Sequence, residues 1–258
     1  MSKIAIIIPT FNALPFMDIL MENIVSDDFF QFYIVDDNSV DGTLNKLKDN
    51  YGFCNNVQIY KKPLNLQKGA SYSRTYAVKF INEDFIYNLD QDDLLYHSEI
   101  KTIVDSPQNF NYDVVLTSIK IKKNNLKYIE NSIYSNINFI NKFLLRIYYP
   151  PRLSSLILKK EILKDINFYP NVTSGGEEWL LFMKLFRRGP KILISNLCIV
   201  EKFVDIHNLS VKNKIKRLES YDNIVNENSN RFEKILYKFF KKIKKIKNEY
   251  LPTQFFKS

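Results

Sequence analysis

Cysteine is scarce in this chain, since only Cys54 and Cys198 occur among its 258 residues. Two cysteines are too few for a disulfide framework, and their spacing is not that of a metal site. Apolar stretches are short as well, and none approaches the roughly 18 residues that predict a membrane-spanning helix. The N-terminus lacks the basic and then apolar pattern of a signal peptide. We therefore expect a cytoplasmic protein.

Net positive charge is small outside one segment, although the chain as a whole carries +9. Residues 231–247 contain one acidic residue, Glu233, and eight basic residues: Arg231, Lys234, Lys238, Lys241, Lys242, Lys244, Lys245 and Lys247. The segment therefore carries a net charge of +7, which leaves +2 for the rest of the chain. A body so close to neutral lacks the basic stripe of a nucleic-acid-binding protein, so we expect no nucleic acid as a partner.

The same basic segment has apolar residues at helical spacing. These are Phe232, Ile235, Leu236, Phe239, Phe240, Ile243 and Ile246. A helix with one apolar face and one lysine-rich face is typical of an interfacial helix on anionic lipid. We expect residues 211–258 to form a basic helical tail that places the protein on the inner face of the cell membrane. A helix packed on its own domain, or an oligomer contact, is the alternative, and the oligomeric state is not indicated.

The first third of the chain alternates between strand and helix patterns. Strands are predicted at Lys3–Ile8, Gln31–Val35, Val57–Tyr60 and Phe85–Leu89. Helices are predicted between them, over Pro15–Ile24, Gly42–Lys48 and 68–82. This order predicts βαβ units and a mainly parallel sheet. Right-handed crossovers then place the carboxyl ends of the strands at one edge.

After about residue 110 the pattern changes. A hairpin is predicted over 113–122 and 126–130. Further strands are predicted over 153–158, 191–197 and 199–204, and helices over 137–146, 159–163 and 177–188. We therefore divide a single domain of residues 1–210 into a first half, 1–110, and a second half, 111–210.

Carboxylates follow two of the predicted strands. Asp90, Asp92 and Asp93 come after Phe85–Leu89, at the edge where open α/β sheets bind ligands. Three carboxylates within four residues repel one another, and a divalent cation bound by oxygen relieves that repulsion. The alternative is a cap for a helix beginning near Leu94. Asp36, Asp37 and Asp41 follow the second strand, and the alternative to a ligand-binding role for them is that they only form a turn.

Five short motifs together resemble the family 2 glycosyltransferases of the GT-A fold. They are Ile6–Asn12 (IIIPTFN), Ile34–Thr43 (IVDDNSVDGT), Leu89–Asp93 (LDQDD), Gly176–Trp179 (GEEW) and His207–Ser210 (HNLS). Their order and spacing match the family over about residues 3 to 210. The resemblance implies an α/β, Rossmann-like GT-A fold, with a mainly parallel central sheet flanked by helices and a C-terminal helical extension.

The resemblance also implies a nucleotide-sugar donor, most simply a UDP-sugar. The predicted donor-binding residues are Pro9, Thr10, Phe11, Asn12, Asp36, Asp37, Lys68, Arg74, Asp90 and Asp92. Of these, Asp37 and the loop that starts at Pro9 are expected to hold the base and ribose, and Asp36 to support the loop. The expected cofactor is Mg²⁺ or Mn²⁺, with Asp92, Asp93 and His207 as metal ligands.

A general base is expected at Glu178, with Glu177 as the alternative. The family has Glu-Asp at this position, whereas this chain has Glu-Glu. Carboxylates in the first turn of a helix also occur for electrostatic reasons alone. The implied reaction is inverting transfer to a hydroxyl group of a glycan or a lipid-linked glycan. The alternative function is a non-catalytic module that binds a sugar nucleotide or glycan at the membrane.

Overall fold

The computed structural model describes residues 4–123, 126–130, 152–163 and 177–203, together with the single residues 226, 231, 234, 235 and 238. The first half contains four parallel strands, in the spatial order β3-β2-β1-β4. They are β1 (Ile4–Thr10), β2 (Phe30–Asp36), β3 (Val57–Lys61) and β4 (Phe85–Asn88). β1, β2 and β4 are buried along their whole length, which explains their nearly continuous apolar sequences.

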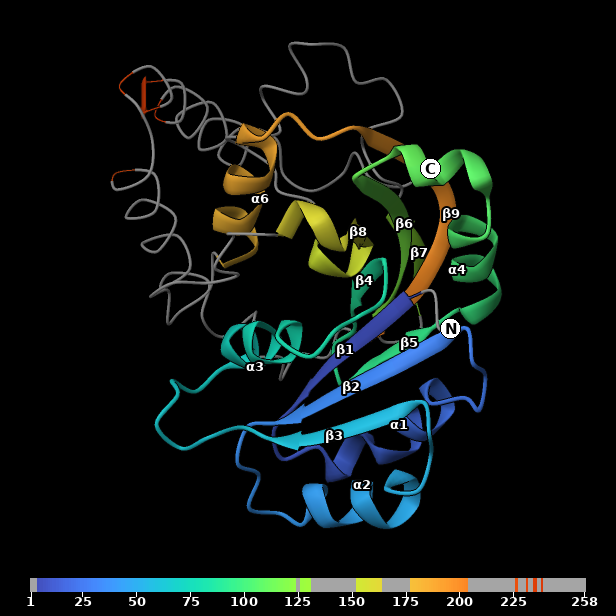
Figure 1. The fold of residues 1–258 in the computed structure, drawn as a ribbon, viewed down its shortest axis with the longest axis vertical. Helices are drawn as coiled ribbons and strands as arrows, with labels where there is room; N and C mark the ends of the chain where they lie inside the picture. Colours follow the sequence, from blue (N-terminus) through green and yellow to red (C-terminus); the bar gives the residue numbers. More distant parts are fainter. Residues whose placement is uncertain are drawn as a thin grey trace.

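Helices cover both faces of this sheet (Figure 1). Successive residues of a strand point to opposite faces, so Ile4, Ile6 and Ile8 pack on one side of β1, whereas Ala5 and Ile7 pack on the other. The first side is covered by α1 (Met17–Asn23), α2 (Thr43–Tyr51) and α4 (His97–Val104). The second side is covered by α3 (Ala70–Val78) and α6 (Glu177–Arg187). Short 3-10 turns are η1 (Leu14–Phe16), η2 (Pro107–Asn111) and η4 (Lys160–Leu163).

The second half extends the same sheet with strands of mixed direction. Beyond β4, the order continues through β8 (Leu156–Lys159), β6 (Val114–Lys123), β9 (Ile192–Phe203) and β5 (Asp93–Leu95). β7 (Leu126–Glu130) pairs with β6 as the predicted antiparallel hairpin. β8 is antiparallel to both of its neighbours, and β6 and β9 are parallel. The parallel arrangement therefore holds for the first half, and the second half is mixed.

Two predictions for the second half need correction. The two strands predicted over 191–204 form one strand, β9, whose register with β6 shifts near Ser118. A bulge takes up an extra residue without ending the strand, so the irregularity in the sequence does not mark a boundary. The predicted strand over 153–158 begins instead with a 3-10 turn, η3 (Leu153–Ser155). The helix predicted over 137–146 lies outside the described residues.

None of the described helices combines the length and the apolar character that crossing a membrane requires.

Candidate active site

The loops after β1 and β2 are joined at the carboxyl edge of the sheet. The backbone N–H of Asn12 donates to Ser39 Oγ at 2.9 Å, and the backbone N–H of Val40 donates to Asn12 Oδ1 at 3.0 Å. Asn12 adopts a positive φ of 48°, a conformation that asparagine tolerates better than most residues. The preceding Pro9 and Thr10 are buried within β1, whereas Phe11 remains 46% exposed.

Asp36 holds the loop after β2 in place. Its carboxylate is fully buried and accepts hydrogen bonds from the backbone N–H of Ser39 at 3.0 Å and from Ser39 Oγ at 2.5 Å. A longer bond of 3.5 Å comes from Thr10 Oγ1 on the neighbouring strand. A buried carboxylate with several donors is well satisfied. Asp36 therefore has the contacts of a loop-supporting residue.

Asp37 lies in an internal ion pair. Its Oδ1 is 2.5 Å from Lys62 Nζ, and its Oδ2 accepts a 2.6 Å hydrogen bond from the backbone N–H of Gly69. Both side chains of the pair are buried, and Lys62 also donates to the carbonyl oxygen of Gln67 at 2.7 Å. Both Asp37 oxygens thus fasten the loop before α3 to the end of β2. Lys62 was not predicted as a site residue, because a lysine next to Lys61 at a strand end is typically exposed.

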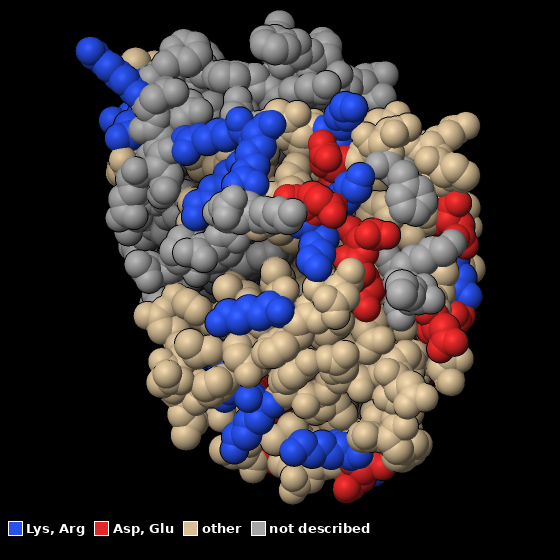
Figure 2. Space-filling view, viewed as in Figure 1, with Lys and Arg blue, Asp and Glu red and all other residues tan. Residues whose placement is uncertain are grey.

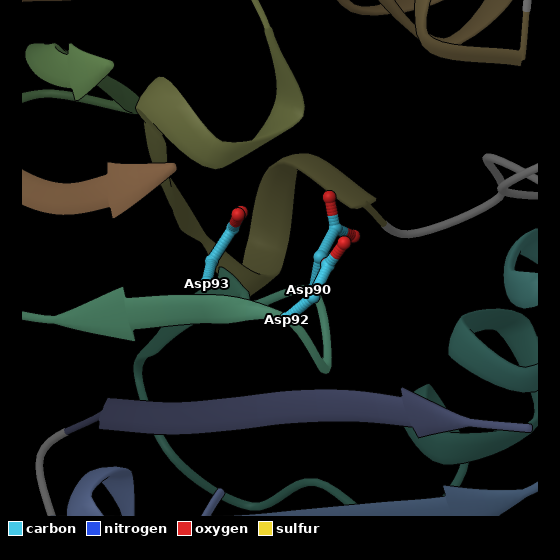
Figure 3. Close-up of side chains that lie close together, drawn as sticks. All are labelled: Asp90, Asp92 and Asp93. Carbon is cyan, nitrogen blue, oxygen red and sulfur yellow. The ribbon is translucent and has the colours of Figure 1, made fainter. Parts of the chain in front are cut away.

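The acidic group Asp90–Asp93 lies between β4 and β5. One carboxylate oxygen from each of Asp90, Asp92 and Asp93 lies within 4.8 Å of the others. In Figure 3 the three side chains rise on the same side of the ribbon, with Asp93 at the start of β5. The helix-cap alternative is wrong, because Asp93–Leu95 pairs with β9 and α4 begins only at His97.

Two basic side chains neutralise part of this acidic group. Arg74 on α3 forms an ion pair of 2.5 Å with Asp90. Lys202 near the end of β9 lies 2.9 Å from the other oxygen of Asp90 and also pairs with Asp93. Within the part of the chain that the structure describes, Asp92 forms no ion pair. Arg74 was predicted as a donor-binding residue, whereas Lys202 was not predicted as a site residue.

The three carboxyl groups differ in their acidity. Burial acts to raise the pKa of Asp90, but the charges of Lys202 and Arg74, together with Arg152, outweigh it and lower this pKa to about 2. Burial and the charge of Asp90 raise the pKa of Asp92. Burial also raises the pKa of Asp93 to about 8, although Lys202 acts in the opposite direction. The group therefore combines one strongly acidic carboxyl with two that resist ionisation.

The acidic group fits a hard divalent cation by its chemistry. All its donors are carboxylate oxygens, which Mg²⁺ and Mn²⁺ prefer, and Asp92 is not committed to a basic partner among the described residues. Figure 2 shows acidic and basic side chains lying next to one another on the face of the molecule seen there. An anionic ligand with its own cation suits such a mixed surface.

The other predicted site residues are placed only in part. Lys68 lies exposed just before α3. Glu177 and Glu178 are the first residues of α6, whose Leu181, Phe182 and Leu185 pack on the α3 side of the sheet. The side chains of both glutamates lie outside what the structure describes, as does His207. The backbone nevertheless places the start of α6 on the face of the sheet that carries Arg74.

Sequence comparisons identify relatives of this chain. The model of the family described as Glycosyl transferase family 2 matches residues 5–167. The poly(ribitol-phosphate) beta-N-acetylglucosaminyltransferase TarS of Staphylococcus aureus is 25% identical over 203 residues, which cover 75% of this chain and 34% of TarS. The enzyme TarP of the same species, with the same activity in its name, is 28% identical over 123 residues, or 45% of this chain and 36% of TarP. The match thus spans about a third of each relative.

Solved structures share the fold. A crystal structure of S. aureus TarS in complex with UDP-GlcNAc has a TM-score of 0.69 at 20% identity, covering 89% of this chain and 68% of that one. The mannosyltransferase PcManGT from Pyrobaculum calidifontis, in complex with GDP-Man and Mn²⁺, has a TM-score of 0.62 at 13% identity. This likeness covers 88% of this chain and 65% of PcManGT. These likenesses confirm the predicted α/β fold of the GT-A type.

Proposed function

Because the chain belongs to glycosyl transferase family 2, we propose that it is an inverting, metal-dependent glycosyltransferase. It moves a sugar from a UDP-sugar to a hydroxyl group of a glycan or lipid-linked glycan. The observation that carries this proposal is the acidic group of Asp90, Asp92 and Asp93, held at the carboxyl edge of the sheet. That edge is where open α/β sheets bind their ligands.

The first donor to test is UDP-GlcNAc. A TarS structure holds this donor, and both S. aureus relatives are named as N-acetylglucosaminyltransferases acting on poly(ribitol phosphate). A polyol-phosphate glycan is accordingly the first acceptor to test. The loops after β1 and β2 form the base site, in which the half-exposed ring of Phe11 offers a face for the base. Asp37 shapes this site by holding the loop before α3.

The diphosphate of the donor lies between the acidic group and nearby basic side chains. Arg74 within α3 and Lys68 just before this helix supply positive charge, and Arg152 acts electrostatically on Asp90. A cation held by Asp92 and Asp93, with His207 as a third ligand, would offset the charge that grows on the departing diphosphate. Mg²⁺ and Mn²⁺ both suit this donor set.

Transfer is a single displacement. Glu178, or Glu177 in its place, accepts the proton of the acceptor hydroxyl. The acceptor oxygen forms a bond to the anomeric carbon from the face opposite the diphosphate. The bond from that carbon to the diphosphate oxygen breaks at the same time, and its electron pair leaves with the UDP. Configuration at the anomeric carbon is thereby inverted, so an α-linked donor yields a β-linked product.

The basic tail places the enzyme at an anionic membrane surface. Residues 231, 234, 235 and 238 are helical, and the side chain of Ile235 is 57% exposed. An exposed apolar side chain among lysines is what an interfacial helix requires. This location brings the enzyme to lipid-linked acceptors on the cytoplasmic side.

Measurement of UDP release from a panel of UDP-sugars tests the proposal. With Mn²⁺ and an acceptor glycan, we expect turnover that EDTA abolishes and that added Mn²⁺ restores.

Asp92→Asn lowers kcat/KM by at least about a hundredfold, since metal stabilisation of the leaving group contributes several kcal/mol. The matched control Asp49→Asn, on the exposed side of α2, keeps full activity. Binding of UDP without any turnover would support the non-catalytic alternative, and transfer unaffected by EDTA would disprove metal dependence.

A further inference from the structure

Lys202 occupies an unusual position for a lysine, because its ammonium lies among the carboxylates expected to hold a metal. In the antiparallel pairing of β5 and β9, Lys202 stands directly opposite Asp93. Its side chain is only 15% exposed, and it pairs with both Asp90 and Asp93. In Figure 3, β9 ends beside Asp93.

The ion pairs of Lys202 lower the negative charge that the acidic group presents to a cation. Asp90, Asp92 and Asp93 together carry three negative charges when ionised, and Arg74 and Lys202 supply two positive ones within ion-pair distance. With all three carboxyls ionised, a divalent cation therefore approaches a group whose net charge is −1 at most. Electrostatic attraction between a cation and a carboxylate is strong in a partly buried site. Because Arg74 and Lys202 offset two of the three negative charges, they weaken metal binding considerably. A diphosphate bound alongside would restore negative charge.

We propose that Lys202 is a positioning residue that takes the place of a metal ion while the donor is absent and so makes metal binding depend on the nucleotide diphosphate. It holds Asp90 and Asp93 together without metal, and Asp92 is left to contribute the first carboxylate to the cation that arrives with the donor. This inference rests on the proposed function, since it assumes a metal and a diphosphate at this edge.

A purely structural ion pair predicts a different result from a positioning role. If Lys202 only stabilised the fold, its removal would disorder the carboxylates and weaken metal binding. If it occupies the place of the cation, its removal uncovers two carboxylates and strengthens metal binding in the absence of nucleotide. The direction of the change in metal affinity therefore separates the two roles.

Electron paramagnetic resonance of free Mn²⁺ measures this affinity directly, without any assay of activity. The wild type is expected to bind Mn²⁺ at least about tenfold more tightly with UDP than without it. Lys202→Met and Lys202→Gln are each expected to tighten nucleotide-free Mn²⁺ binding by about tenfold or more. The glutamine variant keeps hydrogen-bond donors near the acids, and so provides a folded protein if the methionine variant is unstable.

Lys120→Met is the matched control. Lys120 lies on the adjacent strand β6 and pairs with Glu201 at 2.8 Å, not with the acidic group, so nucleotide-free Mn²⁺ binding is expected to stay at the wild-type value. Equal Mn²⁺ affinity of the wild type with and without UDP, or unchanged or weaker Mn²⁺ binding in the folded Lys202 variants, overturns the inference and leaves the proposed function standing. Failure of every variant and the wild type to bind Mn²⁺ with UDP overturns the proposed function and this inference with it.

Discussion

Gln91 links the two parts of the proposed donor site. Its side-chain Oε1 accepts a 2.8 Å hydrogen bond from the backbone N–H of Phe11, and its Nε2 donates to the carbonyl oxygen of the same residue at 3.3 Å. A side-chain amide pairs with a backbone amide in this way because both offer one donor and one acceptor. The middle residue of the acidic motif therefore ties the loop proposed to bind the base to the carboxylates proposed to act at the diphosphate.

Gln91→Ala is expected to weaken UDP binding by about three- to tenfold, which corresponds to the usual net value of one or two hydrogen bonds. The free energy of unfolding should change little, because these bonds are exposed to solvent. Isothermal titration with UDP and Mn²⁺ measures the effect. Gln108→Ala, an exposed glutamine in η2, is the control. A wild-type dissociation constant in Gln91→Ala would show that the link is not used.

At the scale of elements, the short strand β5 depends on a side chain of α1. Asn23 ends α1, and its Nδ2 donates to the carbonyl oxygen of Asp93 at 2.8 Å, while its Oδ1 accepts from the backbone N–H of Leu95 at 2.7 Å. β9 pairs with the other edge of β5. On the edge of β5 opposite β9, Asn23 thus makes the backbone hydrogen bonds that a neighbouring strand would otherwise make. His97 also contacts the Asn23 carbonyl oxygen at 2.8 Å, which gives this histidine a structural role.

Asn23→Ala is expected to lower the free energy of unfolding by about 2 kcal/mol or more, because it leaves two buried backbone groups of β5 without partners. Urea unfolding measures this loss. Mn²⁺ and UDP should also bind more weakly, since β5 carries Asp93. Asn50→Ala is the control, because the one contact of the Asn50 amide with other described residues is a long one of 3.9 Å to Met21 Sδ. A change within about 0.5 kcal/mol is expected there, and an equal loss in both variants would contradict the role of Asn23.

At the scale of the whole molecule, one continuous sheet joins the two halves of the chain. β8 and β6 come from the second half and extend the parallel strands of the first, while β5 returns from the first half to the far edge beside β9. The acidic group lies where the chain leaves β4 for β5, so both halves contribute to it: Arg74 from the first and Lys202 from the second. The basic tail is the remaining part of the molecule for which we propose a function, the binding of an anionic membrane surface.

The tail is expected to bind vesicles that contain anionic phosphatidylglycerol and not vesicles of phosphatidylcholine alone. Each lysine near an anionic surface contributes about 1 kcal/mol. A variant in which four tail lysines become glutamine should therefore bind at least about a hundredfold more weakly in co-sedimentation. The four are Lys241, Lys242, Lys244 and Lys245. The control changes four exposed lysines elsewhere: Lys46, Lys48, Lys61 and Lys79. Equal losses in the two variants would exclude a specific role for the tail.

The sequence predicted the elements of the first half and the position of the acidic group well. Buried parallel strands are apolar almost throughout, and short helices with polar faces separate them, so β1, β2 and β4 could be identified from local patterns. The predictions were weaker where the chain is irregular. β9 was divided at its bulge, and β5 was not predicted, because three residues held by Asn23 and β9 have no periodic pattern of their own.

The sequence by itself determined which residue types stand at the ends of the strands, because apolar strand cores and the carboxylates that follow them are local features. Only the tertiary structure decided which charges meet there. Lys202 lies 112 positions from Asp90, and Lys62 lies 25 positions from Asp37, yet both ammonium groups contact these carboxylates. Such partners are brought together by strand order and register, which depend on packing across the whole sheet and leave no mark in the neighbouring sequence.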